Sequence, residues 1–393
     1  MTDSANQPYR TWANRSLIVA AVGIVVCLGV AVFQAGLLWH AYLFAFLACW
    51  LAAMGATGLL ALGNLTGGWW ARAGRPFYTA LMHTLPLVAI AFIPIALKLS
   101  SIYPWANPDL SEELHFAHGK AEYLSTSFFL WRAVGYFVAW LLVAWLLNVV
   151  TRADRVPAET SAMRRAGAFS LVVLVPTTTF AAFDWSMSLE PEWYSSIYGA
   201  ILTAGGVLAA HAITIIGLTS LWRRMPDEAQ AITGALPAST HEGKTLVDVL
   251  NDLGNLTLAF VMVWAYFAFS QFLITWAGNL PSEIVWYIRR LADGWQVIAL
   301  AVVFLNFAVP FLMLLSRERK RNPNRIVVVA VLLLVAYVLQ MYWTVVPAFG
   351  AHGVLGHAAN LAALAALGGL WLAMVCWRAD RAVQRFSVAA GTK

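Results

Sequence analysis

Ten apolar stretches, each long enough to cross a bilayer as a helix, divide this chain. A hydrocarbon core about 30 Å thick needs roughly 20 helical residues, and lipid accommodates only segments that satisfy their own backbone hydrogen bonds. The sequence therefore predicts an all-α polytopic membrane protein, a single integral membrane domain over residues 1–393. The predicted spans are residues 16–33, 41–63, 77–97, 127–150, 167–185, 195–222, 256–277, 296–315, 326–346 and 354–377.

Composition agrees with a membrane protein, since 61% of the residues are hydrophobic and only 11% are charged. Soluble domains carry about a quarter charged residues, so a soluble fold is excluded. The net charge of +6 would suggest nucleic acid as a partner in a soluble protein. Here the basic residues lie in the connections between spans, which indicates the lipid bilayer as the partner and argues against nucleic acid.

Lys and Arg gather on alternate connections. The exceptions are Lys98, Lys120, Arg289 and Arg290, which fall on the opposite side, and Arg132, which lies within a span. Because cytoplasmic connections are enriched in Lys and Arg, we expect both termini in the cytoplasm. The cytoplasmic segments then include residues 1–15, 223–254 and 378–393, and residues 223–254 form a linker between the sixth and seventh spans.

Small residues and prolines mark individual spans. In the sixth, Gly205 and Gly206 precede Ala209 and Ala210 by one turn, a spacing that favours close helix packing. In the third, Pro86 and Pro94 predict a bend, because proline leaves a backbone carbonyl without its donor.

Ionisable residues at membrane depth need a partner or a wet cavity. Arg132 is placed a short way into the fourth span and Asp184 ends the fifth, so consecutive helices bring them to a similar depth. We expect an ion pair near the outer face. It is either a structural lock between two helices or a site for a quinone head group or an exchangeable proton.

His83 and His211 are the histidines well inside spans. They differ in predicted depth, which disfavours paired haem ligation. A hydrogen-bonded interior histidine is the commoner case, with a proton relay as the alternative. Gln271, beside Ser270 in the seventh span, would extend such a relay or simply join neighbouring helices.

No covalently bound cofactor and no metal are expected, and a quinone or quinol is the one small molecule that the sequence leaves open. Cys27, Cys49 and Cys376 are too dispersed for an iron–sulfur cluster. His115 and His118 in an outer loop have carboxylates nearby, but an exposed acidic docking loop explains them better than a metal site. No nucleotide-binding or hydrolase motif occurs in a structural context in which it could function.

Several local patterns resemble a known family. They are Gly63-Asn64-Leu65-Thr66-Gly67-Gly68-Trp69-Trp70, the turn at residues 102–106, residues 123–132, residues 183–199 and residues 269–276 with Asn279-Leu280-Pro281. They resemble the NrfD-like membrane subunits of alternative complex III, a bacterial quinol:cytochrome c oxidoreductase. The likeness covers about residues 50 to 350 and is closest to the smaller subunit, the quinone-binding subunit 2 type.

The resemblance implies paired four-helix bundles plus two extra helices in the bacterial inner membrane. It also implies a larger NrfD-like paralogous membrane subunit, an iron–sulfur subunit and multihaem cytochrome c subunits as partners. In that family quinol oxidation is placed mainly in the larger paralogue, and the smaller subunit is assigned quinone contact, proton conduction or assembly. One departure is Gln340-Met341 before Tyr342-Trp343, where the family often has an acid, which puts a proton path there in doubt.

Two other functions fit the pattern of spans. A secondary transporter of a small solute would use ten spans and a polar outer cavity, but such proteins commonly show discontinuous helices and inverted repeats. Neither is evident in the sequence. A purely structural scaffold of a respiratory complex differs from the leading hypothesis only in lacking quinone or proton chemistry.

Overall fold

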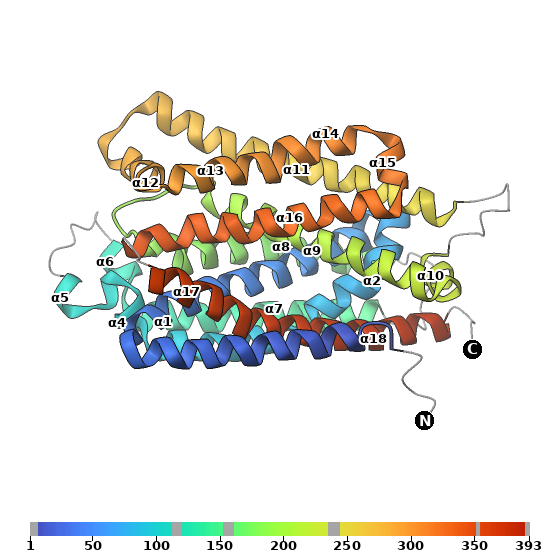
Figure 1. The fold of residues 1–393 in the computed structure, drawn as a ribbon, viewed down its shortest axis with the longest axis horizontal. Helices are drawn as coiled ribbons and strands as arrows, with labels where there is room; N and C mark the ends of the chain where they lie inside the picture. Colours follow the sequence, from blue (N-terminus) through green and yellow to red (C-terminus); the bar gives the residue numbers. More distant parts are fainter. Residues whose placement is uncertain (1–6, 112–119, 152–160, 235–243, 351–353, 390–393) are drawn as a thin grey trace.

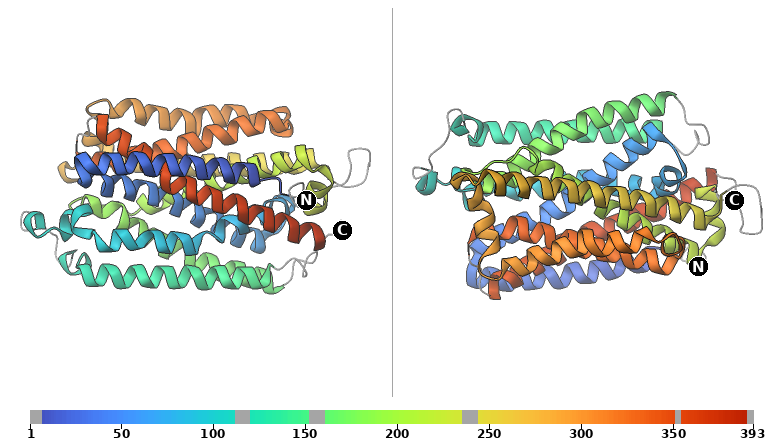
Figure 2. Two further views of the ribbon diagram at one scale, coloured as in Figure 1. Left: turned by 60° about the horizontal axis from the view of Figure 1, so that its bottom comes forward. Right: turned by 90° about the horizontal axis from the view of Figure 1, so that it is seen from above.

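The computed structural model describes residues 7–111, 120–151, 161–234, 244–350 and 354–389, and these are helical with no strand among them. They form the bundle seen in Figures 1 and 2. The long helices are α1 (Arg10–Thr66), α7 (Thr126–Val150), α8 (Ser161–Trp185), α9 (Tyr198–Arg224), α11 (Leu246–Gly278) and α16 (Pro323–Val345). The all-α membrane fold predicted from the sequence is confirmed.

The remaining spans consist of shorter segments. One combines α2 (Trp69–Met82) with α3 (Leu85–Leu97), another α13 (Trp295–Val303), η4 (Phe304–Ala308) and α14 (Val309–Leu315), and the last α17 (Val354–Ala363), η6 (Leu364–Gly368) and α18 (Gly369–Ala389). Connecting segments are α4 (Leu99–Ile102), η1 (Pro104–Ala106), α5 (Pro108–Ser111), α6 (Lys120–Tyr123), η3 (Met187–Leu189), α10 (Pro226–Thr233), α12 (Pro281–Leu291), α15 (Arg317–Arg321) and η5 (Val346–Phe349).

Nine helical segments among the described residues are long and apolar enough to cross a membrane. The first, α1, has 57 residues, about 85 Å of helix, and is interrupted at Gln34, whose φ and ψ are −151° and 79°. The rings of Tyr9, just before α1, and Phe77, midway along α2, lie 6.1 Å apart, so both ends of α1 are at the same end of the bundle. Helix α1 therefore supplies the first two of the ten predicted spans, as its reversal in Figure 1 shows.

The end where α1 begins and α18 ends is called the terminal end below (Figure 1). The opposite end, which carries α4, α5, α6 and α12, is the distal end. The second arm of α1 and α9 are the most enclosed helices, and α8, α16 and α2 pack around them. The grouping into two four-helix bundles plus two helices remains a prediction.

The predicted linker at residues 223–254 is largely helical where the structure describes it. Helix α10 lies within it, and α11 begins at Leu246, ten residues before the predicted seventh span. The early start is explained by a capping box in which the Thr245 hydroxyl accepts from the Asp248 N–H and the Asp248 carboxylate accepts from the Thr245 N–H. Residues 235–243, in the middle of the predicted linker, lie outside the described part.

Helices α1 and α9 touch backbone to backbone at glycines. A Cβ placed on Gly206 would lie 2.3 Å from the Leu51 carbonyl oxygen, and one on Gly55 would lie 2.3 Å from the Gly206 carbonyl oxygen. The prediction of close packing from the small residues of the sixth span is therefore confirmed at Gly206.

Gly206→Ala is expected to destabilise the protein by about 1 to 3 kcal/mol, because the added methyl group forces two backbones apart. Gly58→Ala on α1 is the matched control, since a Cβ there meets nothing within 4 Å. Thermal unfolding in detergent measures both variants. Equal melting temperatures for Gly206→Ala and Gly58→Ala would contradict the close contact.

Candidate functional site

Asp184 lies in the last turn of α8, where backbone carbonyls lack helical partners. At the distal end, two side-chain hydroxyls act as donors to these carbonyls. The Ser188 hydroxyl donates to the Asp184 carbonyl, and the Tyr103 hydroxyl donates to the Trp185 carbonyl at 3.0 Å. The buried Trp185 ring packs 4.7 Å from Trp50. The helix end and the Asp184 side chain are thus held in place from several directions.

The carboxylate of Asp184 forms a two-point ion pair with Arg132 of α7. Nε and Nη2 of Arg132 donate to the two carboxylate oxygens, each at 2.9 Å. Tyr136, one turn further along α7, donates its hydroxyl to Asp184 Oδ2 at 2.8 Å. The Asp184 side chain is 0% exposed and that of Arg132 12%. The ion pair expected from the sequence is present, and both oxygens of the carboxylate are engaged.

Aromatic rings and a carbonyl enclose the other side of Arg132. Its guanidinium carbon lies 3.8 Å from the Tyr123 ring centre and 4.4 Å from that of Phe128, and Nη1 donates to the Tyr123 carbonyl at 2.8 Å. Burial and the neighbouring Asp184 carboxylate raise the pKa of the Tyr123 phenol, so it stays protonated. We call Asp184, Arg132, Tyr136 and Tyr123 the Asp184 cluster.

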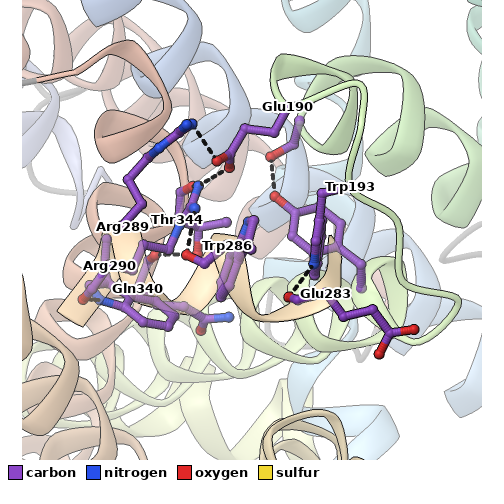
Figure 3. A network of polar contacts seen from close by, with 11 residues as sticks. Glu190, Trp193, Glu283, Trp286, Arg289, Arg290, Gln340 and Thr344 are labelled. Atoms are coloured by element: carbon purple, nitrogen blue, oxygen red, sulfur yellow. Dashed lines mark hydrogen bonds and ion pairs between the residues drawn. The ribbon is translucent and has the colours of Figure 1, made fainter. Parts of the chain in front are cut away.

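A second group of charges lies at the same end. Glu190, just after η3, accepts from Arg289 Nη1 and Arg290 Nη2 of α12, both at 2.6 Å (Figure 3). Arg289 is 46% exposed, whereas Arg290 is 1% exposed. Burial lowers the pKa of the Arg290 guanidinium, while Glu190 favours its charged form.

Arg290 also joins α12 to α16. Its Nη2 donates to the Thr344 carbonyl at 2.7 Å, and its guanidinium carbon lies 3.9 Å from the Trp286 ring centre. The Trp343 indole in turn donates to the Arg290 carbonyl at 3.1 Å. We call Glu190, Arg289, Arg290, Trp286 and Thr344 the Glu190 network; Figure 3 shows its charged groups meeting between helices.

A pocket of about 520 Å³ borders this network. Its lining residues are Arg289, Asp293, Gly294, Trp295, Ile298, Tyr342, Pro347, Gly350 and His357. The Tyr342 hydroxyl and His357 Nδ1 are hydrogen-bonded, and the Trp295 ring lies 5.4 Å from that of Tyr342. The volume and the mixture of aromatic walls with a few polar groups are typical of small-molecule sites.

His211 is fully buried and has partners at both ring nitrogens. Nε2 donates to the Leu253 carbonyl at 3.0 Å, and Nδ1 is hydrogen-bonded to the Tyr78 hydroxyl at 2.6 Å. His83 lies in the break between α2 and α3, near Asn148 and Arg378. The contacts of the two histidines within the described residues lead to different helices.

Gln271 joins α11 to the segment before α9, because its Oε1 accepts from the Ser195 hydroxyl at 2.5 Å. Its Nε2 donates to Thr275 at 3.2 Å. Gln340 stands where the family that the sequence resembles often has an acid. It is buried and accepts from the Trp264 indole at 3.1 Å. The described contacts of Gln271 do not lead to His211, so they favour helix joining over a relay.

Other predicted features lie partly outside the described residues. His115 and His118 fall in residues 112–119, and parts of both predicted tails, residues 1–6 and 390–393, are also outside. Within the described residues, no group of three or more His, Cys, Asp or Glu side chains is placed to hold a metal ion.

Sequence reasoning missed Tyr136, the Glu190 network and the pocket residues Trp295 and His357. The sequence does indicate Tyr136, because it follows Arg132 by four residues and therefore lies on the same face of the helix. Glu190 and Arg290 are 100 residues apart, and nothing local indicates that they meet.

No known protein-family model matches the sequence, and no curated protein matches it. The fold and its apolar helices define the chain as an all-α polytopic membrane protein.

Proposed function

We propose that this chain is a membrane subunit of a bacterial quinol:cytochrome c oxidoreductase of the alternative complex III type. It would lie in the inner membrane with both termini cytoplasmic, beside a larger paralogous subunit, an iron–sulfur subunit and multihaem cytochromes c. Its part in quinol-linked electron transfer would be quinone contact, proton conduction or assembly.

One observation carries the proposal: four of the five segments that bear the family resemblance meet at the distal end. Residues 102–106 contact residues 183–199 through Tyr103 and Trp185, and residues 123–132 contact them through Arg132 and Asp184. Residues 269–276 contact them through Gln271 and Ser195. Patterns that are scattered in the sequence thus form one polar region, which supports a shared function over independent chance likenesses.

At the same end of the bundle, the pocket beside the Glu190 network is the better candidate for contact with a quinol ring. The Asp184 carboxylate is closed off by Arg132 and Tyr136, whereas the pocket has space beside Trp295, Tyr342 and His357. Quinol oxidation releases two protons and two electrons. The His357 imidazole, hydrogen-bonded to Tyr342, would accept the proton of one ring hydroxyl, and the proton of the other would pass to water at the distal surface. The two electrons would pass to cofactors of the partner subunits.

Tyr342→Phe is expected to raise the KM for quinol of the assembled complex about tenfold, the effect of losing one hydrogen bond worth roughly 1.4 kcal/mol. The quinone retained on purification should fall with it. Tyr266→Phe on α11 is the matched control, because Tyr266 is 67% exposed and does not line the pocket. Unchanged KM and unchanged quinone content in Tyr342→Phe would remove the pocket from the proposal.

A secondary transporter is the second candidate, and the break at His83 and Thr84 favours it. Helix α2 ends at Met82 and α3 begins at Leu85, with Pro86 in its first turn, so this span is discontinuous. Affinity purification of the tagged chain separates the two functions. Multihaem cytochromes in the purified material support the oxidoreductase, and their absence supports the transporter.

A further inference from the structure

Helix α18 carries three arginines on one face at the terminal end. Arg378, Arg381 and Arg385 are spaced by three and then four residues, which places them side by side along the helix. Ala379 and Val383, on the other side, are buried in the bundle. Arg381 and Arg385 are therefore exposed, and Arg378 is partly buried at the edge of the bundle.

These arginines have no acidic partner among the described residues. Arg321 and Arg325, at the same end of the bundle, each pair with a carboxylate. Asp380 is close in sequence, but it is buried and accepts the Tyr9 backbone N–H at 2.9 Å. Nε of Arg378 is buried and makes no hydrogen bond within the described residues. Like charges held together repel, so an anion bound among them would be stabilising.

Polar groups of two other helices approach the same place. His83, in the break after α2, is close enough to Arg378 and Arg385 to interact with their charges, and it pairs with Asn148 near the end of α7. Guanidinium groups, an imidazole and an amide thus converge from three parts of the fold. This set of donors suits the oxygen atoms of a phosphate group.

The surface next to the arginines is apolar and suits lipid. Trp377 is 47% exposed, and the guanidinium carbons of Arg378 and Arg381 lie 5.3 Å and 3.6 Å from its ring centre. Leu370, two turns earlier on the same face, is 40% exposed. An indole at this position is typical of the membrane interface, with the apolar residues before it facing acyl chains.

We propose that Arg378, Arg381 and Arg385, with His83, bind the phosphate of an anionic phospholipid whose acyl chains lie along α18. Basic pockets between transmembrane helices bind such head groups through charge and hydrogen bonds. The site is independent of the quinol proposal, because it lies at the opposite end of the bundle from the pocket.

The test uses the full chain in nanodiscs containing phosphatidylglycerol and phosphatidylethanolamine, with native mass spectrometry to count retained lipids. Arg378→Gln with Arg385→Gln is expected to lower phosphatidylglycerol retention by about fivefold per charge removed, and to leave phosphatidylethanolamine unchanged. The control is Arg317→Gln with Arg319→Gln, two exposed arginines of α15 at the same end. It should change retention less than twofold.

Equal loss of phosphatidylglycerol in test and control variants would overturn the proposal. So would displacement of the lipid by millimolar inorganic phosphate, which would indicate a site for a soluble anion. Unchanged lipid retention with loss of a copurifying protein would assign the arginines to a partner's acidic segment. If the double variant does not fold, the wild-type chain provides the test. Phosphatidylglycerol should raise its melting temperature more than phosphatidylethanolamine does, and equal effects of the two lipids would overturn the proposal.

Discussion

Asp184→Asn is expected to destabilise the folded chain by about 3 to 5 kcal/mol, the usual cost of removing one partner of a buried ion pair. The physical reason is that Arg132 keeps its charge in a largely buried place but loses the two-point contact at 2.9 Å. Denaturant unfolding in detergent and the amount of chain in the membrane measure the effect. Tyr136→Phe is the control for hydrogen bonding alone and should cost only about 1 kcal/mol.

Combining Asp184→Asn with Arg132→Gln separates the two roles of the pair. A structural lock needs only that no charge is left alone, so the double variant should recover part of the lost stability. Proton exchange needs an ionisable carboxylate, so lost proton release in a normally assembled Asp184→Asn variant would favour that role. If Asp184→Asn changes neither stability nor turnover, Asp184 has no part in the site.

Arg290→Gln is expected to cost about 3 to 5 kcal/mol, whereas Arg289→Gln should cost less than about 1 kcal/mol. The two neighbouring arginines bind the same carboxylate at the same 2.6 Å. They differ in burial, and only Arg290 also donates to the Thr344 carbonyl and lies over Trp286. The two variants therefore compare a buried guanidinium and its added contacts with an exposed one, while the charge and the shared Glu190 carboxylate stay the same.

Melting temperatures of the two variants in the same detergent provide the measurement. Glu190→Gln should resemble Arg290→Gln, because it too leaves the buried guanidinium without its carboxylate. Similar losses for Arg289→Gln and Arg290→Gln would show that the burial of Arg290 contributes nothing, against the structure of the Glu190 network.

Helix ends were harder to predict than helix positions. The first turns of α11 contain Asp248, Asn251 and Asp252, so hydropathy placed the start of that helix well after Leu246. The break before α3 was anticipated as a bend because proline leaves backbone groups unpaired, but its exact place at His83 and Thr84 was not. End positions depend on caps and tertiary contacts, which composition does not report.

The sequence by itself determined that this is an all-α membrane protein and where its spans lie, because hydropathy is local and lipid leaves no alternative to helices there. It also placed Arg132 near Asp184, since consecutive spans return the chain to the same depth. Only the tertiary structure decided that Glu190 meets Arg290, that Tyr342 meets His357 beside a pocket, and that α18 aligns its arginines near His83. Those contacts join distant segments through side-chain packing, and no short-range pattern in the sequence encodes which helices become neighbours.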